Sequence, residues 1–271
     1  MKETINQVAS QIKAKIGNYR PKIGIILGSG LGGMADAIEN PVIIPYEEID
    51  GFPRSTVSGH AGRLVIGKLN GVDVLCMQGR VHFYEGHSPA SLALVIRAYK
   101  KVGIEKMILT NAAGSLNSDM GPGSLMVISD HINLSGCNPL IGPNDEEFGP
   151  RFPDMTYAYD AEMRKKMIEA AEKEGVNMYM GVYLMTSGPN FETPAEIMMF
   201  RMMGANAVGM STVSETLCAI HCGMKVAGVS VITNYGAGMV NEKQTHEETL
   251  AQANEAGKKL QRVITRLVTE I

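Results

Sequence analysis

The sequence contains no tryptophan, only four cysteines and no long apolar run among its 271 residues. A membrane-spanning helix needs about 20 predominantly apolar residues, and no stretch of this chain supplies them. The first residues, from Met1 to Thr4, lead into a mixed polar and apolar segment and not into the apolar core of a signal peptide. We therefore expect a cytoplasmic protein with no membrane partner.

The four cysteines are Cys76, Cys137, Cys218 and Cys222, and their spacing is not typical of a disulfide framework. Cys218, His221 and Cys222 would share one face of a helix, a spacing that a metal site could use. No second cluster of ligands accompanies them, so buried structural thiols are the favoured interpretation. We expect no metal site.

An excess of basic residues is missing as well. The formal net charge is −3 and the pI is near 6.1, and no basic stripe marks a nucleic-acid partner. Hydrophobic residues make up 45% of the chain and charged residues 20%, which is the balance of a globular and not a disordered protein. A chain of this length can bury a substantial core without disulfides or structural metals.

The hydrophobic pattern predicts helices that alternate with strands. The clearest local signal is Asn70-Gly71 between two β-rich runs, 63–69 and 72–77, which predicts a hairpin. Ser88-Pro89 predicts the start of a helix, with serine as its cap and proline in its first turn. We expect further helices at 2–17, 160–174, 194–203, 212–222 and 245–269, and further strands at 22–27, 107–109, 178–185, 206–208 and 225–233.

This alternation predicts an α/β layered fold, and the hairpin makes its sheet mixed. No internal repeat or low-complexity linker interrupts the chain. We expect one domain over residues 1–271, with its core at about 20–270. Its fold class would be a three-layer α/β fold, in which helices flank a mixed, mostly parallel central sheet.

A glycine loop, residues 28–33, follows the first predicted strand. It matches the dinucleotide-binding pattern G-x-G-x-x-G, with Glu47 and Glu48 about twenty residues further on. The helix after it is only about two turns long, however, whereas a βαβ crossover needs a longer helix and a parallel second strand. It is not a Walker-type loop either, because no Gly-Lys-Ser/Thr ends it. Two interpretations remain: a phosphate cradle built from backbone N–H groups and the Ser29 hydroxyl, or a tight turn that needs glycine.

Basic and aromatic residues gather where the second strand of the hairpin ends. Continued alternation along that strand would point Arg80, His82 and Tyr84 to one side. A guanidinium and an imidazole on one face can hold an oxyanion, and a tyrosine hydroxyl can bind a sugar. His60 and His87 add to the density of this region. The alternative is an exposed, solvated strand end.

A series of short motifs runs in one order from about residue 22 to the C-terminal helix. It comprises Leu27-Gly28-Ser29-Gly30-Leu31-Gly32, the segment from Gly79 to His87, Asn111-Ala112-Ala113-Gly114, Asp130-His131-Ile132-Asn133, Gly142-Pro143-Asn144-Asp145, Arg151-Phe152-Pro153, Gly188-Pro189-Asn190-Phe191-Glu192-Thr193, Val208-Gly209-Met210-Ser211-Thr212, Ile232-Thr233-Asn234 and His246-Glu247-Glu248. The series resembles the trimeric purine nucleoside phosphorylase family. So many ordered matches are more specific than any single motif.

The resemblance implies a phosphate site and a nucleoside site. Phosphate would be held by Ser29, Arg80, His82, Ala112 and Ser211, with His60 nearby and Ala112 acting through its backbone N–H. These residue types suit a dianion, which needs positive charge, hydroxyl donors and free N–H groups. The nucleoside would meet Tyr84, Met210 and His246 at the ribose, Phe191, Glu192 and Asn234 at the base, and Phe152 from a neighbouring subunit of a homotrimer. Catalytic roles would belong to His82, Glu192, Asn234 and His246.

A purely local explanation competes with some of these assignments. Thr193, Thr212 and Thr245 are each followed three residues later by glutamate, which is the pattern of a helix capping box. Ser211 and His246 could therefore be ordinary helix-start residues.

Two further observations bear on the site. Asn111, Ser211 and Asn234 each follow a predicted strand, which is where α/β folds bind ligands. Tyr235 departs from the mammalian relatives, which carry lysine there, and is closer to bacterial members. The contacts to the base are in doubt for that reason, but the reaction is not.

The resemblance implies a reversible phosphorolysis of 6-oxopurine (deoxy)ribonucleosides, such as inosine and guanosine, to the free base and (deoxy)ribose 1-phosphate. Phosphate would stabilise cationic ribose and then capture it, while donors at N7 and O6 stabilise the leaving purine. Phosphate is then a co-substrate, and we expect no organic cofactor or metal.

Three alternatives stay open. A methylthioadenosine phosphorylase would share the fold, but relatives acting on 6-amino purines tend to carry aspartate at the position of Asn234. A dinucleotide-dependent oxidoreductase rests on the loop 28–33 alone. A non-catalytic nucleoside-binding protein is the option that is not an enzyme.

Overall fold

Helices and strands alternate along the chain in the computed structural model, which describes residues 2–57, 60–240 and 245–271, the side chain of His246 excepted. The α-helices are α1 (Lys2–Lys15), α2 (Pro89–Val102), α3 (Ala161–Lys173), α4 (Pro194–Met202), α5 (Val213–His221) and α6 (His246–Leu267). The strands are β1 (Ile23–Leu27), β2 (Glu39–Pro45), β3 (Arg63–Leu69), β4 (Val72–Gln78), β5 (Lys106–Ser115), β6 (Leu125–Asn133), β7 (Met178–Met185), β8 (Ala207–Gly209) and β9 (Lys225–Tyr235). Short 3-10 helices cover Gly32–Ala37, Tyr46–Glu48 and Phe83–Glu85.

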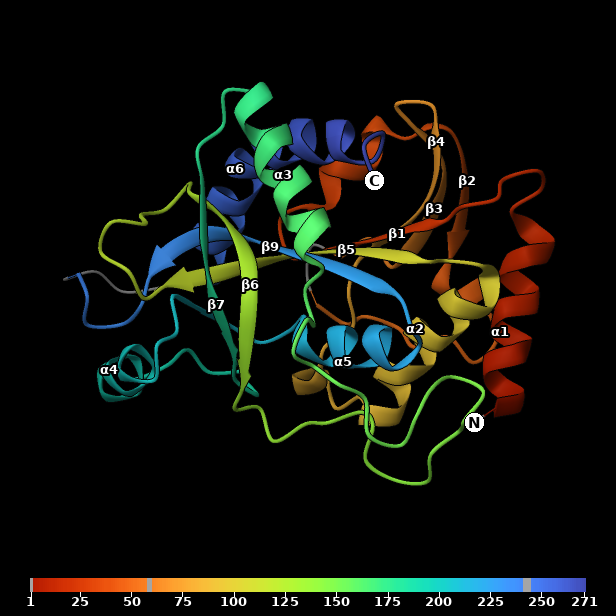
Figure 1. Ribbon diagram of the computed structural model, residues 1–271, viewed down its shortest axis with the longest axis horizontal. Helices are drawn as coiled ribbons and strands as arrows, with labels where there is room; N and C mark the ends of the chain where they lie inside the picture. Colours follow the sequence, from red (N-terminus) through yellow and green to blue (C-terminus); the bar gives the residue numbers. More distant parts are fainter. Residues whose placement is uncertain (1, 58–59, 241–244) are drawn as a thin grey trace.

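The strands of the described part form one mixed sheet in the order β2-β3-β4-β1-β5-β8-β7-β6-β9. β1 runs parallel to both β4 and β5, while the hairpin strands β3 and β4 are antiparallel. β5 also pairs with β9, and β9 with β6. Strands β5, β8, β7, β6 and β9 therefore close on themselves into a barrel-like unit, which occupies the left half of Figure 1.

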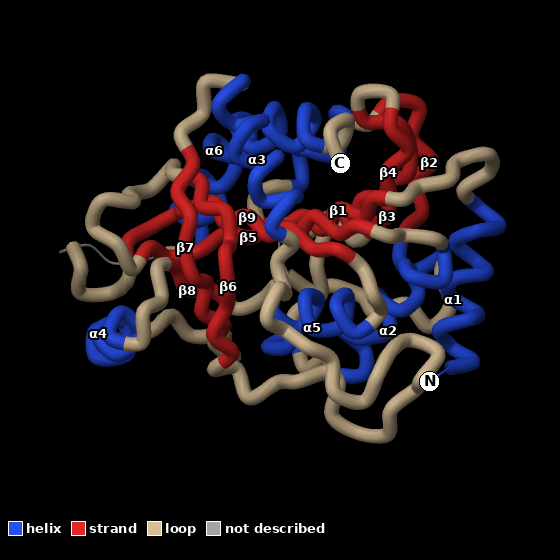
Figure 2. Tube along the Cα trace, in the orientation of Figure 1, coloured by secondary structure: helices blue, strands red, loops and turns tan. Residues whose placement is uncertain are grey.

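Helices cover both faces of the sheet. α3 and α6 lie on one face, and α1, α2 and α5 lie on the other (Figure 2). Alternate residues of β4 serve the two cores: Leu75 and Met77 pack with the second group of helices, and Val74 and Cys76 with the first. This alternation is the period-2 pattern of a strand buried on both faces. The predicted three-layer α/β fold with a mixed sheet is confirmed.

The predicted hairpin is also confirmed. Asn70 and Gly71 have φ values of 50° and 81°, which is the left-handed backbone that a two-residue hairpin turn requires at both positions. Two strands, β2 and β6, were not predicted from the sequence. β2 contains Pro41 and Pro45, which argue against a strand but are tolerated at the edge of a sheet. For β6, the motif at 130–133 was recognised, but no strand was predicted there.

The glycine loop 28–33 leads into a six-residue 3-10 helix, and β2 then lies at the far edge of the sheet, antiparallel to β3. The βαβ unit of a dinucleotide-binding fold is therefore not formed here. At Gly28, a Cβ atom would lie 2.8 Å from the Cα of Asn111, so β1 and β5 approach closely where the loop begins. Among the described helices, none has the length and apolar character that a bilayer crossing requires.

Candidate active site

A cleft opens beside the ends of β1, β5, β8 and β9. Its empty volume is about 680 Å³, including the part that opens to solvent. The cleft brings together ten of the residues that the sequence predicts for the site: Ser29, Arg80, His82, Tyr84, Ala112, Phe191, Glu192, Met210, Ser211 and Asn234. Residues from distant parts of the chain thus meet where α/β folds bind ligands.

His60 lies directly behind Ser29, outside the lining of the cleft. Its Nε2 is 3.1 Å from the Ser29 hydroxyl, and its Nδ1 is 2.8 Å from the carbonyl oxygen of Arg80. Burial and the neighbouring His82 lower the pKa of His60 to about 4, so the ring is neutral at pH 7. Because a carbonyl can only accept, Nδ1 carries the proton and Nε2 accepts from Ser29. The Ser29 hydroxyl must turn away from His60 before it can donate to a ligand in the cleft.

Arg80 is the buried cation of the cleft, with only 1% of its surface exposed. Its Nη1 donates to the carbonyl oxygen of Thr110 at 2.8 Å and to the Ser211 hydroxyl at 3.0 Å. Its Nε forms an ion pair with Glu215 at 2.6 Å. The remaining nitrogen, Nη2, is buried without a hydrogen-bond partner in the described part of the chain. A buried donor of this kind is costly unless a ligand satisfies it.

The segment that carries His82 and Tyr84 is not an extension of β4, and the expected continued alternation is wrong. β4 ends at Gln78, and residues 83–85 form a 3-10 helix. The backbone N–H of His82 donates to Glu85 Oε1 at 2.7 Å, and its Nδ1 lies 3.1 Å from the same oxygen, which closes a local cap. The rings of His82 and Tyr84 still stack, with centroids 4.6 Å apart, so both face the cleft.

Protonation in this segment follows from its contacts. Burial opposes ionisation of Glu85, but hydrogen bonds from His82 and Thr56 outweigh it and lower the pKa of Glu85 to about 2. Burial lowers the pKa of His82 in spite of Glu85, so His82 is neutral and its Nε2 is the acceptor of the ring. Burial and Glu85 raise the pKa of Tyr84 to about 12, which keeps its hydroxyl protonated.

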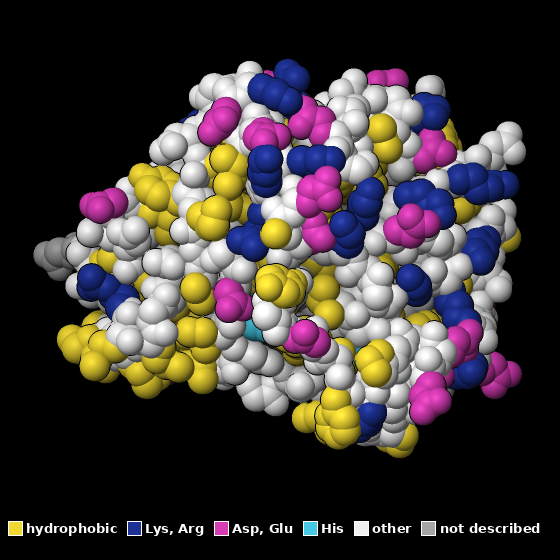
Figure 3. All heavy atoms as spheres, viewed as in Figure 1, with side chains coloured by type: hydrophobic (Ala, Val, Ile, Leu, Met, Phe, Trp, Pro, Cys, Tyr) yellow, Lys and Arg dark blue, Asp and Glu magenta, His cyan; other side chains and the backbone are white. Residues whose placement is uncertain are grey.

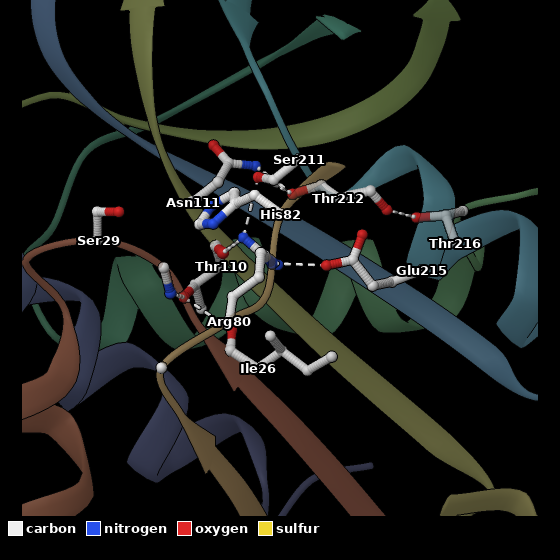
Figure 4. A network of polar contacts seen from close by, with 12 residues as sticks. Ile26, Ser29, Arg80, His82, Thr110, Asn111, Ser211, Thr212, Glu215 and Thr216 are labelled. Carbon is white, nitrogen blue, oxygen red and sulfur yellow. Dashed lines mark hydrogen bonds and ion pairs between the residues drawn. The ribbon is translucent and has the colours of Figure 1, made fainter. Parts of the chain in front are cut away.

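The alternative explanation of a capping box at the start of α5 is wrong. Thr212 precedes α5 but makes no side-chain cap bond, and its φ of 76° is strained for a β-branched residue. Its hydroxyl instead accepts from Asn111 Nδ2 at 2.9 Å and lies 3.2 Å from the Ser211 hydroxyl. Glu215 pairs with Arg80 (Figure 4). Ser211 is therefore more than a helix-start residue, since it contacts the guanidinium in the cleft.

The other two threonines do cap their helices. Thr193 and Glu196 form a full capping box at α4. The Thr245 hydroxyl accepts from the backbone N–H of Glu248 at 3.3 Å, at the start of α6. The side chain of His246 lies outside the described residues, so its predicted role stays a prediction.

The lining of the cleft also includes an acid, Glu192, and an amide, Asn234. Burial raises the pKa of Glu192, and the Thr186 hydroxyl donates to its Oε1 at 3.2 Å. Asn234 Oδ1 accepts from the Thr233 hydroxyl at 2.8 Å, and its Nδ2 donates to the carbonyl oxygen of Tyr235 at 3.0 Å. Part of the local bonding expected of a strand-end amide is thus present. Each atom of the amide nevertheless keeps a second hydrogen-bonding position.

Tyr235 does not contribute to the lining of the cleft. Its hydroxyl donates to the carbonyl oxygen of Ser118 at 3.3 Å, in the loop after β5. A Cβ atom on Gly121 would lie only 2.7 Å from this hydroxyl. Tyr235 therefore packs against that loop.

Two residues that were expected to follow strands lie within them, and two other residues of the cleft were not predicted individually. Asn111 lies within β5 and not after it, and its Oδ1 is buried without a partner in the described part of the chain. Asn234 is likewise within β9. Thr233 and Thr249 also line the cleft. Thr249 could have been found from helical spacing, because it lies one turn after the first residues of α6.

Phe152 does not reach the cleft of its own chain. It lies on the long segment between β6 and α3 and is 87% exposed. Phe191, at the cleft, is itself 40% exposed. The predicted contact of Phe152 with a neighbouring subunit remains a prediction.

Burial of histidines predicts a loss of stability in acid. Burial lowers the pKa of His60, His82, His131 and His221. The unfolded chain therefore binds protons first as pH falls through about 6.5, and stability is lost until each folded pKa is reached, about 4 for His60. We expect the midpoint temperature of thermal unfolding to decrease as the pH is lowered from about 7.5 to about 5.5. His60→Asn should reduce this decrease. A midpoint that stays constant or rises over this range would contradict the assignment of neutral, buried histidines.

The chain is similar to proteins of known activity. Residues 22–269 match the family described as the phosphorylase superfamily. Purine nucleoside phosphorylase 1 of Bacillus subtilis (strain 168) is 50% identical over 250 residues, which cover 92% of each chain. Purine nucleoside phosphorylase of Rattus norvegicus is 47% identical over 260 residues, 93% of this chain and 90% of the relative.

Comparison with solved structures identifies the same kind of protein. Schistosoma mansoni purine nucleoside phosphorylase in complex with inosine has a TM-score of 0.94 at 40% identity, over 99% of this chain and 96% of the other. A structure of the same protein with adenosine has a TM-score of 0.94 at 41% identity, over 99% and 97%. The family that the ordered motifs predicted is therefore confirmed: this chain belongs to the purine nucleoside phosphorylases of the phosphorylase superfamily.

Proposed function

We propose that this cleft carries out the reversible phosphorolysis of 6-oxopurine nucleosides, with inorganic phosphate as its co-substrate. The observation that carries the proposal is the buried Arg80, which lines the cleft together with an acid and an amide and whose Nη2 has no protein partner in the described chain. Such a donor suits an oxyanion. Glu192 and Asn234 together offer the acceptor and donor that the N1–H and carbonyl edge of a 6-oxopurine requires.

The chemistry divides between the two ends of the cleft. The bond from the ribose carbon to the purine nitrogen breaks, and its electron pair leaves with the base. Asn234 and Glu192 stabilise the leaving purine through hydrogen bonds, while a phosphate oxygen forms the new bond to the ribose carbon. Arg80, Ser29 and Ser211 would hold that phosphate beneath the sugar, so the reaction needs positioning and fixed dipoles. We propose no metal or organic cofactor, and we propose that the protein acts in the cytoplasm.

We also propose a homotrimer in which Phe152 completes the site of a neighbour. Two separate apolar patches support a head-to-tail contact: Ile141, Phe152 and Tyr157 on one segment, and Met198, Met199, Met202 and Met203 on α4 and its C-cap. The second lies where hydrophobic side chains gather at the lower left of Figure 3. Different patches that meet head to tail generate a closed ring when the rotation closes.

The trimer makes a measurable prediction. Sedimentation equilibrium should give about three times the chain mass of 29.2 kDa. Phe152→Ala should raise KM for the nucleoside and leave KM for phosphate within about twofold, since the ring would contact only the base and sugar. Ile43→Ala is the matched control, because Ile43 is 47% exposed on the edge strand β2. A fully active monomer at assay concentration would refute the proposal.

A panel of substrates tests the activity. We expect release of base from inosine and guanosine only when phosphate is present, and slower release from adenosine and methylthioadenosine. A preference for methylthioadenosine would favour that alternative phosphorylase, and nucleoside binding without turnover would favour a binding protein.

A further inference from the structure

The inference concerns Glu215, which does not contact the cleft but holds the residue that does. Its Oε1 lies 2.6 Å from Arg80 Nε, and the two side chains are only 9% and 2% exposed. Among the described residues that line the cleft, Arg80 is the only lysine or arginine. Whatever fixes this guanidinium therefore fixes the cationic part of the site.

The guanidinium is held on two of its three nitrogens. Nη1 is occupied by the Thr110 carbonyl and the Ser211 hydroxyl, and Nε faces Glu215 (Figure 4). Only Nη2 remains without a protein partner in the described chain. Because the five N–H donors of arginine lie in one plane, fixing Nε and Nη1 also fixes the direction of Nη2.

Glu215 has been diverted from an ordinary helix cap. Three Thr-x-x-Glu patterns precede helices in this chain, at Thr193, Thr212 and Thr245. The first forms both cap bonds and the third forms its threonine cap, whereas Thr212 forms no side-chain cap bond. Positions at which a local rule fails without a local gain are expected at functional sites.

Stability does not explain the pair. Two charges removed from water pay a desolvation cost that their attraction barely offsets, so a buried ion pair is weak evidence for stabilisation. The start of α5 also includes Thr212 at a φ of 76°, which is a strained conformation. The strained backbone of Thr212 and the buried charge of Glu215 lie at the same helix start. Both are explained if this backbone conformation places Ser211 and Glu215 against Arg80.

We propose that Glu215 is a positioning residue for the phosphate step, which acts by fixing the orientation of Arg80. The proposal rests on the proposed phosphate site around that arginine. We expect the length of the side chain at position 215 to matter as well as its negative charge. Aspartate at this position would keep the negative charge but withdraw the carboxylate by about 1.5 Å, to roughly 4 Å from Nε. Seven of the eight other residues of α5 are buried, so the packing of the helix in the core opposes a shift that would close this gap.

The test is the pair Glu215→Asp and Glu215→Ala in the full-length protein. We expect KM for phosphate to rise about threefold or more in the aspartate variant and about tenfold or more in the alanine variant. The dissociation constant of inosine without phosphate, measured by equilibrium dialysis, should stay within about twofold, because Glu215 is not among the residues that line the cleft. A general loss of structure would weaken both ligands alike.

Glu174→Asp is the matched control. Glu174 also pairs with an arginine at the end of a helix, at 2.7 Å from Arg266, but away from the cleft. We expect its phosphate KM to match that of the unchanged protein. If Glu215→Asp folds and keeps the phosphate KM of the unchanged protein, the positioning role is wrong. If Glu215→Ala does not fold, the aspartate variant alone decides. A failure of the unchanged protein to use phosphate at all would instead overturn the proposed function.

Discussion

Asn234→Asp is expected to shift the substrate preference from inosine toward adenosine. An ionised aspartate only accepts hydrogen bonds, so it repels a carbonyl at purine position 6 and accepts from an amino group there. Each mispaired buried polar group costs roughly 1–3 kcal/mol. Two opposite changes would move the ratio of kcat/KM for inosine over adenosine by about 10²–10⁴, at about 1.4 kcal/mol per tenfold.

The control for Asn234→Asp is a variant that loses a similar local hydrogen bond outside the cleft. Its Nδ2 donates to the carbonyl oxygen of the next residue, and Asn190 Nδ2 makes the same kind of contact with Phe191 at 3.0 Å. Asn190 is exposed and does not line the cleft. Asn190→Asp should therefore lose a similar local bond without changing the ratio. If Asn234→Asp also leaves the ratio within about twofold, and lowers both activities alike, Asn234 caps the strand end and does not read the base.

Arg80→Ala is expected to have the largest effect on phosphate. A hydrogen bond to a charged group contributes about 1.5–3 kcal/mol, so KM for phosphate should rise by about 10- to 150-fold. The substitution also leaves Glu215 buried without its partner, which should lower stability by about 3–5 kcal/mol. Initial rates at varied phosphate, with urea unfolding in parallel, measure the two effects.

Arg266→Ala serves as the control for Arg80→Ala. Arg266 pairs with Glu174 but is about two-fifths exposed, so its loss should cost at most about 1 kcal/mol and leave phosphate kinetics alone. Equal phosphate KM values for Arg80→Ala and the unchanged protein would mean that phosphate does not bind at this guanidinium.

Much of the fold follows from local signals. The predicted strand 178–185 coincides with β7, and the Asn-Gly turn and the Ser-Pro helix start were both found from residue chemistry alone. β2 was missed because its prolines are tolerated only at a sheet edge, and a local pattern does not show which strand is an edge. The closure of β5 to β9 into a barrel depends on long-range pairings that have no local signature.

The features of the site that were not predicted also depend on contacts between residues far apart in the sequence. The ordered motifs led to the ten predicted residues that line the cleft, because members of one family share a fold and with it the positions of their site residues. The competing local explanation fitted Thr212 and Glu215 to a capping box, because a local rule cannot anticipate that Arg80, 135 residues before Glu215, would pair with that carboxylate instead. Asn111 was noted for its place near a strand end, but its contacts could not be predicted, because only the tertiary structure leaves its Oδ1 buried without a partner in the described chain.

The central claim is that phosphate itself attacks the sugar. Inosine should be incubated with the protein at increasing phosphate, and hypoxanthine and ribose 1-phosphate quantified together. We predict that hypoxanthine release requires phosphate and that one ribose 1-phosphate forms for each hypoxanthine. Release of hypoxanthine with free ribose, independent of phosphate, would show that water and not phosphate is the nucleophile and would contradict the account.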